Sequence, residues 1–181
     1  MDSIRGQLLI AGPTLGDPNF WRTVVLIVEH SDEGALGLVL NRPSETTVGE
    51  AVPQLTELVD PDDDVLVGGP VQQSGVIVLA EFEDPTDAAL IAFEDIGIVG
   101  TTSEAIERST GVRAARAFAG HAGWGPGQLE DELERGDWIL EPARRADAFT
   151  AAPAELWPAV LTRKGGSYAL IARMPADPSQ N

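Results

Sequence analysis

The sequence predicts an α+β fold, and three observations lead to that class. Apolar runs of strand length recur along the 181 residues, separated by clusters of Gly, Pro and Asp. Two early runs, 23–29 and 35–40, are joined by a turn-forming segment at 31–34, which is typical of an antiparallel hairpin. Short helical patterns stand between the runs in no regular alternation, which favours α+β over a regular parallel α/β sheet.

The first part of the chain contains a buried strand at 7–11, followed by a loop at 12–18 that is dense in Gly, Pro and Asp. The run at 23–29 is apolar on both faces, as expected for a central strand. Its partner at 35–40 ends before Pro43, because proline has no N–H to donate to a strand pair.

In the middle of the chain, the Thr-x-x-Glu pattern at 47–50 has the form of a capping box and predicts a short helix. An acidic break at 60–64 comes before β-rich runs at 65–70 and 75–80. The segment 81–89 is predicted as an acidic loop.

A strand at 96–99 is predicted to pass into a helix over 103–109, for which Thr101 and Glu104 have the spacing of a capping box. A further strand follows at 114–120, where small and apolar residues alternate.

The glycine-rich segment 120–128 is predicted as a turn that leads into a helix over 126–135. A strand is expected at 138–140 and a helix at 154–161, with Pro158 implying a late start or a kink. The apolar segment 168–172 is expected to close the core.

Composition predicts one domain over residues 1–181, with flexible residues at its very end. Hydrophobic residues make up 43% of the chain and the mean hydropathy is −0.03, both ordinary for a globular protein. The longest apolar runs have strand length, well short of the roughly 20 residues of a membrane-spanning helix. No signal peptide is recognisable and there is no cysteine, so a cytoplasmic location and no membrane contact are expected.

The net charge of −17 argues against direct nucleic-acid binding, which requires clustered Lys and Arg. The acidic residues are scattered over the chain, which is typical of a solvated acidic surface. A surface that attracts a basic protein partner or cations is the alternative.

No metal or cofactor motif is complete. The only two histidines, His30 and His121, lie far apart in sequence, and no cysteine exists to complete a zinc site. The acidic run at 60–64 resembles the start of a calcium loop but lacks the required glycine and glutamate. The only lysine, Lys164, is not part of a P-loop. No metal and no cofactor are therefore expected.

Two segments have alternative interpretations. In 120–128, Trp124 and four glycines could form a pocket floor with His121 as a general base, or Trp124 could plug the core while the glycines turn the chain. The aromatics of the 17–22 segment could bind a ligand, or could attach the loop to the sheet.

Several motifs in the same order resemble the AlgH/YqgE family over nearly the whole chain. The residues that carry this likeness lie at 9–13, 17–18, Phe20, Arg22, 24–25, 29–30, 34–43, 68–71, 120, 122–130, Trp138 and 174–181. The resemblance implies a branched, largely antiparallel sheet rolled into a pseudo-barrel with flanking helices. It also implies a family without a settled activity, some of whose members are labelled transcriptional regulators. His121 departs from the pattern, since relatives more often carry an aromatic residue there.

These motifs define a predicted ligand- or partner-binding surface. Its members are Asp17, Phe20, Arg22, His30, Asn41, Arg42, Gly69, Trp124 and Gln128. The leading hypothesis is a non-enzymatic binding or regulatory module with a protein or small-molecule partner. The alternative is a nucleotide- or anion-binding protein or a hydrolase, in which Arg22 or Arg42 holds an anion and His30 or Glu29 acts as base.

Overall fold

The computed structural model of the protein describes residues 2–109 and 111–175. The predicted flexible end of the chain, from residue 177, lies outside the described residues. Ten strands are present in the described part. They are β1 (Gln7–Ala11), β2 (Val24–Ser31), β3 (Gly34–Val39), β4 (Pro43–Thr47), β5 (Asp64–Val67), β6 (Val71–Glu81), β7 (Leu90–Phe93), β8 (Ile96–Ile98), β9 (Ala114–Trp124) and β10 (Trp138–Pro142).

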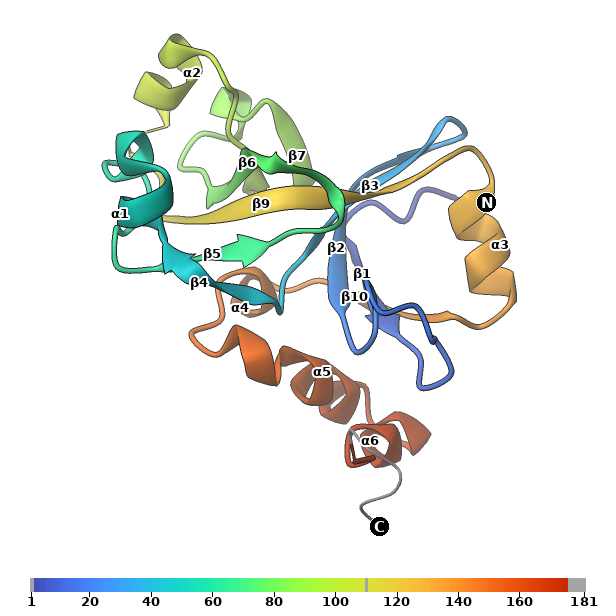
Figure 1. The fold of residues 1–181 in the computed structure, drawn as a ribbon. Coiled ribbons are helices and arrows are strands. Elements are labelled where there is room, and N and C mark those ends of the chain that lie inside the picture. The colour runs from blue at the N-terminus through green and yellow to red at the C-terminus, as the bar shows by residue number, and fades with distance from the viewer. Residues whose placement is uncertain (1, 110, 176–181) are drawn as a thin grey trace.

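Short helices flank these strands. Within the same described residues they are α1 (Val48–Ala51), α2 (Ser103–Arg108), α3 (Gln128–Glu134), α4 (Arg145–Ala148), α5 (Leu156–Lys164) and α6 (Ser167–Ile171), with 3₁₀ turns at Pro53–Leu55, Pro85–Asp87 and Pro153–Glu155. Figure 1 shows α1 and α2 near one end of the sheet, α3 at the opposite end, and α5 and α6 along one side.

The sheet is branched and largely antiparallel. Its main path runs β10-β1-β2-β3-β9-β6-β8-β7, and β5 joins β9 in parallel while pairing with β4 on its other side. The long strand β9 is the branch point, because it pairs with β6 along most of its length, with β5 at 118–119 and with β3 at 122–124. β7 packs against β2, so the sheet curls, but its path through the described residues does not close. The predicted α+β class is confirmed.

Three glycines allow the strands to cross tightly at the branch point. A Cβ at Gly69 would overlap the backbone of His121 and Ala122, and one at Gly68 would overlap the carbonyl of Gly120. Gly120 itself has φ +75, a left-handed conformation that glycine adopts readily. The glycine at position 69 is therefore required by the close approach of two backbones.

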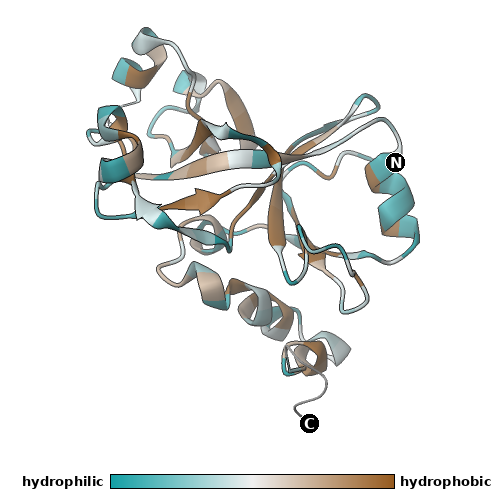
Figure 2. Ribbon diagram, in the orientation of Figure 1, coloured by the Kyte–Doolittle hydropathy of each residue, from teal (hydrophilic) through white to brown (hydrophobic). Residues whose placement is uncertain are grey.

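The central strands are buried on both faces, which explains their continuous apolar sequence. Val24, Leu26 and Val28 pack on one face together with Trp157 of α5. Val25 and Ile27 pack on the other face with Trp124 and Trp138. A third cluster lies between α1, β6 and β9. Figure 2 shows hydrophobic residues concentrated on the strands and hydrophilic residues on α3.

Helix starts agree with the sequence only in part. Thr47 caps α1 by accepting a hydrogen bond from the Glu50 amide at 3.3 Å, as predicted. The cap of α2 is Thr102, whose Oγ1 accepts from the Ala105 amide at 3.1 Å, so the prediction of Thr101 was wrong by one residue. Pro158 occupies the third position of α5, which confirms the late start.

Four segments differ from the prediction. The glycine-rich segment 120–124 is the end of β9 and not a turn, because β3 supplies it with a pairing partner from far away in the sequence. β4, β7 and α4 were not predicted; β4 has the polar sequence PSETT, and its pairing with β5 is the tertiary contact that makes it a strand.

Candidate functional site

The loop at 17–22 is a turn held by its own polar groups. The Oδ1 atom of Asp17 accepts a hydrogen bond from the amide of Asn19 at 2.9 Å, and the carbonyl of Asp17 accepts from the amide of Phe20 at 3.0 Å. Such Asx turns are typical of Asp followed by Pro. The side chain of Asp17 therefore shapes the loop from within.

Arg42 ties this loop to the sheet from the other side. Its guanidinium donates hydrogen bonds to the carbonyls of Pro18 and Trp21, both at 3.2 Å, and to the carbonyl of Asn19. Burial lowers the pKa of Arg42, and the nearby carboxylate of Asp17 opposes that shift. The guanidinium is thus engaged by three backbone acceptors of one loop.

Asn41 fixes the end of the same loop. Its Oδ1 accepts from the amide of Val24 at 2.9 Å, and its Nδ2 donates to the carbonyl of Arg22 at 2.9 Å. Arg22 has φ 53, an unusual conformation for a residue with a side chain. The amide of Asn41 holds that conformation in place.

The side chain of Arg22 reaches the C-terminal segment after α6. Its Nη2 donates to the carbonyls of Met174 at 2.7 Å and Pro175 at 2.9 Å. Its guanidinium carbon lies 4.5 Å from the ring centroid of Trp157 and 5.0 Å from that of Trp21. Arg22 therefore joins the loop, α5 and the end of the described chain.

Phe20 and Trp124 form an aromatic cluster with Trp138. Phe20 stacks on Trp124 with centroids 6.1 Å apart, and Trp138 meets both rings edge-on. The indole N–H groups of Trp124 and Trp138 donate to the same oxygen of Glu132, at 3.1 and 2.9 Å. Trp124 is only 6% exposed, so it packs the core, and Phe20 attaches the loop to the sheet.

Gln128 and Gly69 also have structural roles. The Oε1 of Gln128 accepts from the amide of Gly125 at 3.1 Å and so closes the turn before α3. Gly69 provides the strand crossing described above. Neither residue extends a free polar side chain into the neighbourhood of loop 17–22.

His30 lies beside a depression of about 530 Å³ that it shares with Glu130. Its Nδ1 accepts from the amide of Ile4 at 3.1 Å, so the ring proton is on Nε2, which donates to Oε1 of Glu130 at 2.5 Å. This hydrogen bond lowers the pKa of Glu130. Because both ring nitrogens are engaged and the side chain is 4% exposed, His30 links the N-terminal segment to α3.

The predicted residues thus do not all lie together. Asp17, Phe20, Arg22, Asn41 and Arg42 meet at loop 17–22. Gly69 belongs to the strand crossing, Trp124 to the aromatic cluster, and His30 and Gln128 to the surroundings of α3. The binding role of all nine residues stays a prediction.

Trp21 is exposed, unlike the two residues next to it in sequence, and the sequence motifs do not include it. Its side chain is 45% exposed, although both neighbours in sequence are anchored. It borders a pocket of about 140 Å³ that is also lined by Pro13, Arg22, Trp157 and Met174. The loop therefore holds one large aromatic side chain at the surface.

A family model described as AlgH-like matches residues 8–169. The chain belongs to the AlgH-like family. It is 41% identical to a UPF0301 protein of Streptomyces coelicolor, over 100% of this chain and 97% of that protein, and 40% identical to one of Thermobifida fusca, over 99% and 96%. The family predicted from the motifs is confirmed.

Two solved structures are similar to this AlgH-like chain. A crystal structure of a protein from Corynebacterium diphtheriae has a TM-score of 0.85 at 29% identity, covering 96% of this chain and 94% of that one. The solution structure of the AlgH protein from Pseudomonas aeruginosa has a TM-score of 0.73 at 33% identity, covering 98% of each chain. The likeness extends over the whole described fold.

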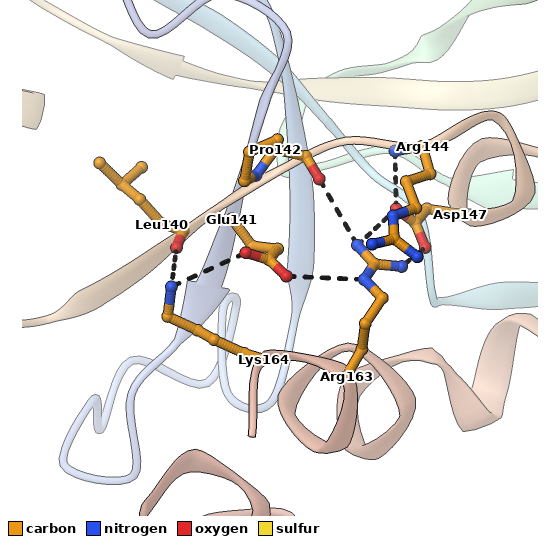
Figure 3. Close-up of polar contacts among 7 residues, drawn as sticks. All are labelled: Leu140, Glu141, Pro142, Arg144, Asp147, Arg163 and Lys164. Atoms are coloured by element: carbon orange, nitrogen blue, oxygen red, sulfur yellow. Dashed lines mark hydrogen bonds and ion pairs between the residues drawn. The ribbon is translucent and has the colours of Figure 1, made fainter. Parts of the chain in front are cut away.

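One polar cluster of this AlgH-like chain was not predicted from the sequence. Its basic side chains donate hydrogen bonds to backbone carbonyls of the edge strand β10. The Nζ of Lys164 donates to the carbonyl of Leu140 at 2.9 Å, and Nη2 of Arg163 donates to the carbonyl of Pro142 at 3.5 Å (Figure 3). Pro142 has no N–H of its own. Basic side chains and proline both protect an edge strand against pairing with another chain.

Two carboxylates hold these basic side chains in place. Asp147, 3% exposed, accepts from Nη1 of Arg163 at 2.7 Å and from the amide of Arg144 at 2.8 Å. Glu141 lies 3.5 Å from Nε of Arg163 and 3.7 Å from Nζ of Lys164. We call Glu141, Asp147, Arg163 and Lys164 the edge cluster; its one sequence signal is the pair of basic residues in the last turn of α5.

Two general features of the described residues bear on function. None of their helices has the length and apolar character needed to cross a bilayer. Among the same residues, no three His, Cys, Asp or Glu side chains are grouped as metal ligands.

Proposed function

We propose that this chain is a non-enzymatic protein-binding module whose contact surface is loop 17–22 and the adjoining C-terminal segment, centred on Trp21. The observation that carries the proposal is that the polar side chains order the loop backbone while one aromatic side chain remains exposed. Asp17, Asn41 and Arg42 use their polar groups on the loop backbone, whereas Trp21 stays 45% exposed. An anchored loop that displays a tryptophan is suited to protein recognition.

The exposed apolar side chains support this choice of surface. Four large hydrophobic residues are exposed in the described chain, and three of them, Trp21, Leu170 and Met174, belong to this loop or to α6 and the segment after it. Met174 also lines the same pocket as Trp21. Tryptophan is enriched among the residues that dominate binding energy at protein interfaces.

Anchoring of the loop favours binding for an entropic reason. A mobile loop loses conformational freedom when it binds, and that loss weakens the complex. Here the hydrogen bonds of Arg42 and Asn41 order the backbone before any partner arrives. The ordering is therefore part of the fold and does not have to be supplied by the partner.

The enzymatic alternative has less support from the geometry. Both ring nitrogens of His30 are engaged, and the guanidinium of Arg42 faces backbone carbonyls. The net charge of −17 argues against direct contact with nucleic acid. Binding of a protein partner in the cytoplasm is the function most consistent with these features.

A peptide-display selection tests the proposal. Random short peptides are selected on the immobilised full chain, and the recovered peptides are then measured by titration calorimetry against variants. Trp21→Ala is expected to weaken binding by about 2 kcal/mol, roughly 30-fold, as for an interface hot spot.

Val71→Ala is the matched control, because Val71 is 38% exposed but lies on β6, outside this loop and the C-terminal segment. Its affinity for the selected peptides should be unchanged, and circular dichroism should show that both variants are folded. Peptides that bind Trp21→Ala as tightly as the wild type would refute the assignment of this surface.

A further inference from the structure

We propose that the partner segment carries an Asp or Glu side chain next to its apolar anchor, and that Arg22 receives this carboxylate. The inference rests on the proposed function, since it concerns the same surface. The inference goes beyond the proposed function by naming the chemistry of the partner.

Among the residues that the structure describes, the charge of Arg22 has no counter-ion. Its Nη2 hydrogen bonds go to two neutral carbonyls, those of Met174 and Pro175. Within the described residues, no carboxylate forms an ion pair with it. Aromatic faces of Trp21 and Trp157, at 5.0 and 4.5 Å, provide the remaining contacts.

Arg22 also has donors besides those on Nη2. A guanidinium has five N–H groups, and the two on Nη2 point to carbonyls, which leaves those on Nε and Nη1. Arg22 lines the pocket of about 140 Å³ together with Trp21, Trp157 and Met174. A carboxylate entering this pocket would meet a cation held between two indole rings, where charge-assisted hydrogen bonds are short and strong.

The local charge favours the same partner. Residues 156–175 contain Arg163, Lys164 and Arg173 and no acidic residue, although the whole chain has 29 acidic and 12 basic residues. Arg163 and Lys164 form ion pairs with the carboxylates of Asp147 and Glu141. Arg173, in contrast, is exposed and directly precedes Met174, which lines the pocket. The negative charge of Asp17, the acidic residue of the loop, is offset by the nearby guanidinium of Arg42. A partner with a carboxylate complements this region of an otherwise acidic protein.

A double-mutant cycle on the selected peptides tests the inference. Each peptide is synthesised with a C-terminal amide, in its original form and with Asp or Glu replaced by Asn or Gln. The original form is also made with a free C-terminus. On the wild-type chain the neutral peptide should bind about tenfold more weakly, as expected for loss of a charge-assisted hydrogen bond. On Arg22→Gln the two peptides should bind equally, whereas on Arg108→Gln, in α2 and outside this surface, the tenfold difference should persist.

The outcomes separate this inference from the proposed function. Peptides that require Trp21 but bind the wild type equally well with Asn or Gln overturn the carboxylate and leave the surface intact. Peptides that lose affinity only when their free C-terminus is amidated also overturn it, because the carboxylate would then be terminal. If Arg22→Gln does not fold, Arg173→Gln decides between the two cations near the pocket: a tenfold difference that persists on it supports Arg22, and loss of the difference overturns the assignment to Arg22.

Discussion

Replacement of Gly69 by alanine is expected to destabilise the protein by more than about 4 kcal/mol, a loss that only a few kinds of substitution reach. The added Cβ would overlap the backbone of His121 and Ala122 in β9. Backbone atoms of a central strand cannot move aside without breaking the pairing of β9 with β3 and β6. The free energy of unfolding, measured by urea denaturation, gives the size of the effect.

Gly123→Ala is the matched control for this substitution. Gly123 lies in β9, the strand that Gly69 approaches, has no heavy atom within 4 Å of an added Cβ and does not have a positive φ. Its replacement should change the unfolding free energy by less than about 0.5 kcal/mol. Equal losses for the two variants would contradict the view that backbone crossing fixes Gly69.

Asp147→Ala is expected to reduce the unfolding free energy by about 3–5 kcal/mol, because it removes the carboxylate that makes the two shortest contacts with a partly buried cation and leaves only the longer contact with Glu141. The carboxylate of Asp147 raises the pKa of Arg163 through their hydrogen bonds at 2.7 and 3.0 Å. It also accepts from the amide of Arg144 at the start of α4. Urea denaturation of the variant measures the loss.

An exposed ion pair is the control for Asp147. Asp95 lies 3.6 Å from Arg113, and both side chains are about half exposed, 49% and 50%. Removal of such a pair by Asp95→Ala should cost no more than about 1 kcal/mol. If Asp147→Ala costs no more than Asp95→Ala, the edge cluster does not stabilise the fold in the way its burial indicates.

Elements that are determined by residues close together in the sequence could be predicted from the sequence. The two-sided apolar run at 24–28 and the turn at 31–34 predicted the β2–β3 hairpin, and Thr47 predicted the start of α1. β4 and the end of β9 could not be predicted in this way, since each becomes a strand only through a partner distant in sequence. Glycines at 120 and 123 indicated a turn when considered without β3.

Only part of the predicted surface comes together in the fold, and its binding role stays a prediction. The motif residues at 17–22 and 41–42 do meet, as their clustering of polar and turn residues suggested. Sequence could not indicate that their polar groups point inward, because that depends on which carbonyls the folded loop offers to Arg42. Phe20 and Trp21 are adjacent in the sequence, and the partial burial of one and the exposure of the other likewise depend on the turn that contains them.

Anchoring of loop 17–22 by motif side chains is the central claim, and backbone ¹⁵N relaxation of residues 19–22 tests it most directly. In the wild type these amides should have order parameters of about 0.85, like the strands, and in Arg42→Ala they should fall below about 0.6 while those of β2 are unchanged. Arg173→Ala should leave the loop as it is. A loop that is already mobile in the wild type, or that stays rigid without Arg42, would contradict the claim.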